Sequence, residues 1–240
     1  MAEIICVRHG QASFGSDDYD QLSETGYLQA RLLGMHLSQA GVELAAIISG
    51  SLKRQLQTAQ GVVDVYLEKG LAVPEIRIDE RWNELQAELQ IKTFLPVLSK
   101  VRPELDKLRQ TSRTDTRSLQ KLIEASFRYW AEEKPEADNL ESWQQAKSRI
   151  AAALSDISND YKPGSITAVF SSGGTISIAA SNVLGLPDNK VYPMFEQLMN
   201  ASMTKILYTK EKLTLKSFNE HAYLDAVAKD AGYKDVITFR

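Results

Sequence analysis

The segment that most constrains the fold of this 240-residue chain lies at its amino terminus. Residues 4–7 read Ile-Ile-Cys-Val, an uninterrupted apolar run that ends abruptly in Arg8, His9 and Gly10. Such a run is typical of a strand buried on both faces of a sheet. Open α/β sheets bind ligands at the carboxyl edge of their strands. We therefore expect these three residues at a ligand site.

The three residues share a chemistry that suits phosphate. Arg8 offers a rigid fork of donors for phosphate oxygens, and His9 offers a nitrogen that can attack phosphorus or carry a proton. Gly10 lets the backbone approach a ligand closely. So short a motif is equally compatible with a surface histidine beside an ordinary ion pair.

Short apolar runs alternate with amphipathic segments along the chain. Residues 45–48, 76–79 and 166–170 are further strand candidates, and this alternation predicts an α/β fold, a mostly parallel sheet with helices on both faces. Residues 202–208 and 212–218 alternate as in an antiparallel hairpin at the sheet edge.

Polar residues mark the ends of several predicted helices. Ser23 is a suitable N-cap for a helix that ends near Gly41, and Ser51 for a helix over residues 52–69. Residues 140–161 form a long amphipathic stretch, and residues 187–200 are predicted to be an irregular connection.

Three sequence blocks resemble the histidine phosphatase superfamily, which has the phosphoglycerate-mutase-like fold. They are V-R-H-G-Q at residues 7–11, L-S-E-T-G with a following Q-A at residues 22–30, and S-L-K-R-Q-L-Q-T-A at residues 51–59. The resemblance implies a three-layer α/β sandwich with His9 as the catalytic nucleophile. It also implies phosphate binding by Arg8, Gln11 and Arg54.

Residues 87–136 form a helical insertion with apolar side chains at helical spacing. The resemblance implies that this insertion is a cap over the pocket that influences substrate choice. We therefore expect one domain over residues 1–240 that includes this cap.

Arg54 is predicted in the first turn of its helix, where the helix dipole favours anions over cations. A bound phosphate would relieve that conflict, because the backbone amides and Arg54 would grip it together. The family also has an acidic proton donor after its third strand. Glu84, in W-N-E-L, is the best match, and Glu80 is the alternative. Burial beside an apolar group such as Trp82 would keep the carboxyl protonated.

The main departure from the family lies after residues 166–170, where Ser172 replaces a second histidine. A hydroxyl donates one hydrogen bond but carries no charge, so stabilisation of the phosphoryl group should weaken. Ser172 and the amides near Gly173 would still contact phosphate. Whether His221, near the carboxyl end, replaces the missing histidine is left open by the sequence.

Composition excludes several other classes. The net charge of −3 and the pI of about 5.7 argue against nucleic-acid binding, and no apolar run is long enough to span a membrane. A single cysteine, Cys6, excludes an internal disulfide and suits the cytoplasm. Three histidines without clustered Cys or Asp give no metal-ligand pattern, and we expect no cofactor.

The sequence thus predicts a phosphatase that hydrolyses phosphate monoesters through a phosphohistidine on His9, with a phosphorylated small molecule or phosphoprotein as substrate. The alternative is a weakened or inactive phosphatase-like protein that binds such a molecule, because of Ser172. A phosphoglycerate mutase is a further alternative, although Ser172 argues against tight phosphate handling. Pairing of the edge hairpin suggests a homodimer.

Overall fold

A computed structural model describes residues 1–13, 19–112, 114–160, 162–230, 232–233 and 236–239. Its centre is a six-stranded sheet in the order β3-β2-β4-β1-β5-β6. The strands are β1 (Ala2–Arg8), β2 (Ala46–Ser49), β3 (Ile76–Ile78), β4 (Ile166–Ser171), β5 (Met203–Tyr208) and β6 (Leu213–Glu220). The first four run parallel, and β5 and β6 add an antiparallel hairpin at one edge. The predicted sheet and hairpin are confirmed.

Strand β1 is buried on both faces, as its apolar run predicts. Successive side chains of a strand point to opposite faces, so Ile4 and Cys6 enter one hydrophobic core while Ile5 and Val7 enter the other. All four are at most 1% exposed. Burial also raises the pKa of the Cys6 thiol to about 12, which keeps the thiol protonated.

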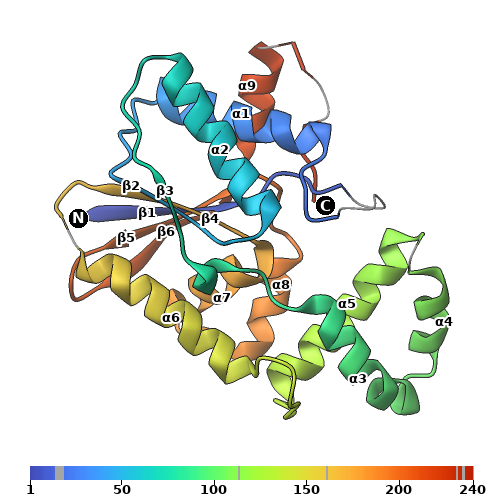
Figure 1. The fold of residues 1–240 in the computed structure, drawn as a ribbon. Helices are drawn as coiled ribbons and strands as arrows, with labels where there is room; N and C mark the ends of the chain where they lie inside the picture. Colours follow the sequence, from blue (N-terminus) through green and yellow to red (C-terminus); the bar gives the residue numbers. More distant parts are fainter. Residues whose placement is uncertain (14–18, 113, 161, 231, 234–235, 240) are drawn as a thin grey trace.

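Helices cover both faces of this sheet and form a three-layer sandwich, as Figure 1 shows. One face carries α1 (Glu24–Gln39), α2 (Lys53–Glu68) and α9 (Ala222–Asp230), and the other carries α6 (Trp143–Asn159) and α7 (Gly173–Leu184). The predicted α/β class with helices on both faces is confirmed.

Three helices lie within the predicted insertion, to one side of the sandwich (Figure 1). They are α3 (Ala87–Val101), α4 (Glu104–Thr111) and α5 (Thr116–Glu132). The segment 187–200 is not irregular throughout, because it forms the 3-10 turn η2 (Asp188–Lys190) and α8 (Val191–Phe195). Pro193 lies inside α8, and because proline disfavours the interior of a helix, the sequence did not predict one here.

The two predicted N-caps differ in outcome. Ser23 caps α1, its hydroxyl accepting from the Gly26 amide at 3.1 Å, and Gly41 follows that helix with φ +68°. The prediction for Ser51 is wrong. Helix α2 has Leu52 at its N-cap position, and the Ser51 hydroxyl pairs with Asn83 instead.

In the described part of the chain, we find no helix that is both long and apolar enough to cross a membrane.

Candidate active site

The site forms where two parallel strands end side by side. Arg8, the last residue of β1, is paired in register with Ser171, the last residue of β4. The His9 amide then donates to the Ser171 carbonyl at 2.9 Å. The register therefore brings the predicted nucleophile next to the position where the family has its second histidine.

The His9 imidazole is held in one tautomer by two contacts of fixed polarity. Nδ1 lies 2.7 Å from the Gly10 carbonyl, which can only accept, so Nδ1 carries the proton. Arg54 Nε lies 3.1 Å from Nε2 and can only donate, so Nε2 carries the lone pair. The nitrogen available for attack is Nε2.

The surroundings of His9 also keep it uncharged. The side chain is 5% exposed. Burial first, and then the positive charges of Arg54 and Arg8, lower the pKa of His9 well below its ordinary value, although the Gly10 carbonyl opposes the shift. The imidazole is thus neutral at neutral pH, as a nucleophile must be.

Hydrogen bonds with two other segments, and close packing on a third, fix the loop that carries His9. The Gly10 amide donates to Thr58 Oγ1 at 3.0 Å, and Asn200 Nδ2 donates to the His9 carbonyl at 3.2 Å. A β-carbon at Gly10 would lie 2.5 Å from the Gly26 carbonyl oxygen. Only glycine allows the loop to pack this closely on the start of α1.

Arg54 projects from the first turn of α2 toward His9, as predicted. Its Nη1 pairs with Asp20 Oδ1 at 2.5 Å, while Asp20 Oδ2 accepts from the Lys53 amide at 2.9 Å. The Asp20 carboxylate thus binds both Arg54 and a backbone amide at the amino terminus of α2, where the sequence predicted a bound phosphate. Arg8 donates from Nη1 to the Leu198 carbonyl.

The structure separates the two candidate acids. Glu84 is partly buried and lines the same cavity as His9, whereas Glu80 is exposed and is absent from the described lining of that cavity. The Glu84 carboxylate accepts from the Leu85 amide at 2.9 Å and from the Gly174 amide at 3.3 Å. A β-carbon at Gly174 would lie 2.6 Å from Glu84 Oε1, so this contact with α7 requires glycine.

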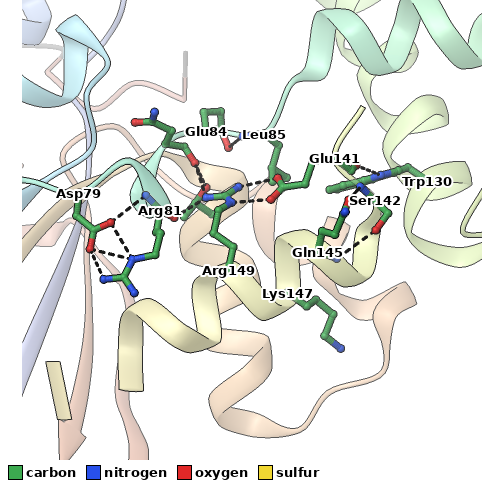
Figure 2. Close-up of polar contacts among 12 residues, drawn as sticks. Asp79, Arg81, Glu84, Leu85, Trp130, Glu141, Ser142, Gln145, Lys147 and Arg149 are labelled. Atoms are coloured by element: carbon green, nitrogen blue, oxygen red, sulfur yellow. Dashed lines mark hydrogen bonds and ion pairs between the residues drawn. The ribbon is translucent and has the colours of Figure 1, made fainter. Parts of the chain in front are cut away.

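The segment that carries Glu84 is held from α6, as Figure 2 shows. Arg149 makes two bonds to the Glu141 carboxylate, at 2.7 and 2.9 Å, and donates to the carbonyls of Arg81 and Asn83. Thr175 Oγ1 also donates to the Asn83 carbonyl at 2.6 Å. The backbone before Glu84 is therefore fixed by both α6 and α7.

Ser172 lies behind the site rather than in it. It is fully buried, and its hydroxyl accepts from Gln55 Nε2 at 2.8 Å. Gln55 also donates to the Trp82 carbonyl at 3.1 Å. Neither Ser172 nor Gly173 is among the described residues that line the cavity, although Gly174 is. The structure thus does not bring the Ser172 hydroxyl to the predicted phosphate position.

The cavity has a volume of about 860 Å³ and brings together Arg8, His9, Arg54 and Glu84. Gln11 lines a neighbouring hollow, and its side-chain oxygen accepts from Ser23 Oγ at 2.8 Å. His221 is absent from the described lining of both hollows. Its Nδ1 lies 2.7 Å from the Asn219 carbonyl.

Sequence reasoning missed three residues that build this site: Asp20, Thr58 and Asn200. Thr58 belongs to the third block of the family pattern, which was a usable signal. Asp20 and Asn200 act through contacts with Arg54 and His9 that are distant in sequence, so no local pattern marks them. Among the described residues, no three His, Cys, Asp or Glu side chains gather as metal ligands would.

The family model described as "Histidine phosphatase superfamily (branch 1)" matches this chain over residues 4–118 and 104–221. The two segments together cover most of the sequence. The chain therefore belongs to the histidine phosphatase superfamily.

Solved structures with the same fold include phosphatases and a mutase. A phosphoserine phosphatase from Entamoeba histolytica, solved with 3-phosphoglyceric acid, has a TM-score of 0.63 at 19% identity, covering 93% of this chain and 100% of that one. A mycobacterial glucosyl-3-phosphoglycerate phosphatase has a TM-score of 0.61 at 18% identity, with 92% and 99% covered. A phosphoglycerate mutase from Bacillus anthracis has a TM-score of 0.64 at 20% identity, with 94% and 96% covered. No curated protein sequence matches the chain.

Proposed function

We propose that this protein is a phosphatase that hydrolyses phosphate monoesters of a small molecule or a phosphoprotein. The observation that carries the proposal is the state of His9. A neutral imidazole with its Nε2 lone pair beside two arginines, in one cavity with a carboxyl group, suits attack on a phosphate. No metal or organic cofactor takes part in the proposed reaction.

The reaction has two steps. When the phosphate binds, the Arg54 Nε–H donates to a phosphate oxygen instead of to His9, which frees the Nε2 lone pair. Nε2 then attacks phosphorus, and the P–O bond to the alcohol breaks while Glu84 protonates the leaving oxygen. Water then attacks the phosphohistidine, giving a proton to Glu84 as the P–N bond breaks. Arg8, Arg54 and amides at the start of α7 balance the oxygen charges.

The test is hydrolysis of 4-nitrophenyl phosphate, with chelator present, by wild type, His9→Ala and His221→Ala. We expect the rate to fall at least about 1,000-fold in His9→Ala. The matched control, His221→Ala, should keep the wild-type rate within about twofold. A rapid quench with ³²P-labelled substrate should label wild type and His221→Ala but not His9→Ala. Equal rates in wild type and His9→Ala would contradict the proposal.

The second candidate is a non-catalytic binder of phosphorylated molecules. The observation that favours it is Ser172, which is buried against Gln55 and supplies no charge to the cavity. A binder would show no turnover in the same assay but would bind inorganic phosphate in calorimetry, with a loss of binding in Arg54→Ala.

A further inference from the structure

The cavity above His9 has two chemically different levels. The charged groups Arg8, Arg54 and Glu84 lie with His9 at the edge of the sheet. Polar side chains such as Gln86, Gln90 and Gln120 line part of the rest, but most of its surface is apolar. The apolar side chains come from the residues after η1 (Glu80–Trp82), from α3, from α5 and from α8. They include Leu85, Leu89, Leu119, Ile123, Phe127 and Phe195.

The apolar wall is firmly anchored in the core of the sandwich. Phe127 is 2% exposed and packs edge-on against Trp130 and Trp143, with ring centroids 5.9 and 5.8 Å apart. Phe195 stacks on Phe127 at 5.8 Å with 16° between the ring planes. The wall is therefore preformed, since close packing of large rings resists rearrangement.

Few positive charges of the cavity lining remain to bind a second anionic group of the substrate. If the phosphate engages Arg8 and Arg54, the only other cation among the described lining residues is Lys92. Besides Glu84, three carboxylates line the cavity: Asp20, which pairs with Arg54, and the exposed Glu88 and Glu196. Lys92 is exposed as well. A carboxylate on the substrate would thus leave water for an apolar wall and meet more negative than positive charge.

We infer that the substrate is a monoester of a largely apolar alcohol, an extended alkyl or aryl group without a second acidic group. The inference rests on the proposed function and names its substrate class. A cavity of about 860 Å³ is large enough for a phosphate and a substantial organic group. Selectivity comes from burial of the alcohol against Leu89, Ile123 and Phe127.

The test compares substrates that react alike but differ in their tails. Hexyl phosphate and 6-(phosphonooxy)hexanoate have the same primary leaving group and differ by a terminal carboxylate. Ethyl phosphate measures the contribution of chain length. We expect kcat/KM for hexyl phosphate to exceed each of the other two by at least about tenfold. Equal values, or a preference for the carboxylate, would overturn the inference.

A charge introduced into the wall should change this order. Ile123→Lys on α5, and separately Leu89→Lys on α3, should each favour the carboxylate relative to hexyl phosphate by about tenfold. Lys121→Ser, on the same helix but absent from the described cavity lining, is the matched control and should keep the wild-type ratio. Thermal unfolding identifies any variant that fails to fold, and the wild-type comparison stands without the variants.

Binding separates this inference from the proposed function. Calorimetry on His9→Asn, which lacks the nucleophile, measures the affinities of the three compounds without turnover. Tighter binding of hexyl phosphate supports the apolar selectivity even if wild type hydrolyses nothing, in which case only the phosphatase proposal fails. His9-dependent hydrolysis of all three compounds without discrimination overturns the selectivity and leaves the phosphatase proposal intact.

Discussion

The ends of β1 and β4 lie side by side, yet only one of them delivers a charged group to the cavity. At the end of β1, Arg8 and His9 line the cavity, and His9 faces Arg54. At the end of β4, Ser172 faces inward to Gln55 and is fully buried. Neighbouring strand ends of one sheet can thus differ in role: the β1 end presents polar side chains to the cavity, whereas the Ser172 side chain is buried against Gln55 of α2.

The largest effect should come from removing Arg54, the positively charged side chain that contacts His9 at the end of β1. Arg54→Ala deletes the proposed donor to the phosphate and the bond to His9 Nε2, so we expect kcat/KM for 4-nitrophenyl phosphate to fall by about 100- to 1,000-fold. Arg31→Ala, which breaks an exposed ion pair with Glu68, is the matched arginine control. A decrease of less than tenfold would show that Arg54 does not touch the reacting phosphate.

Restoring a histidine at the β4 end tests why the two ends differ. Ser172→His alone should lower stability by about 1–3 kcal/mol, because Gln55 fills the space beside Ser172. The double variant Ser172→His/Gln55→Ala should recover stability and raise kcat/KM by about tenfold or more. Thermal unfolding and steady-state kinetics give the two readouts. If the single variant is already stable and faster, Gln55 is not the reason why Ser172 lies buried.

Acidification should reveal the neutral state of His9. Its pKa is lower in the folded than in the unfolded chain, so below about pH 6.5 the unfolded chain takes up the proton first. The free energy of unfolding should therefore decrease as the pH falls, by up to about 1.4 kcal/mol per pH unit from this group. Urea unfolding of wild type and His9→Asn between pH 7 and 5 measures it. Parallel curves for the two proteins would contradict the lowered pKa.

The smallest effect concerns the carboxylate that pairs with Arg54. Asp20→Asn keeps a hydrogen-bond acceptor near the Lys53 amide but removes the negative charge. In the variant, no carboxylate at position 20 competes with an anion for Arg54. Inorganic phosphate should therefore inhibit the hydrolysis of 4-nitrophenyl phosphate about three- to tenfold more strongly than in wild type. Glu43→Gln, an exposed surface change, is the control. Unchanged inhibition would mean that Asp20 and phosphate bind Arg54 together.

The sequence predicted the elements whose signals are local. The run at residues 4–7 identifies β1, Ser23 identifies the start of α1, and the position of His9 after the strand places it at the sheet edge. What it could not predict depends on contacts between distant segments. The Ser172 hydroxyl pairs with Gln55, which is 117 positions away, and no periodicity encodes that pair.

The carbonyl of Gly10 has a consequence for the chemical identity of any phosphorylated enzyme. Because it holds the Nδ1 proton, a phosphoryl group on His9 must form the Nε2 positional isomer, which ³¹P NMR can distinguish from its Nδ1 counterpart. The acceptor belongs to the main chain, so only a change in the path of the loop moves it away from Nδ1. The backbone conformation of this loop thus determines which nitrogen of His9 can carry a phosphoryl group.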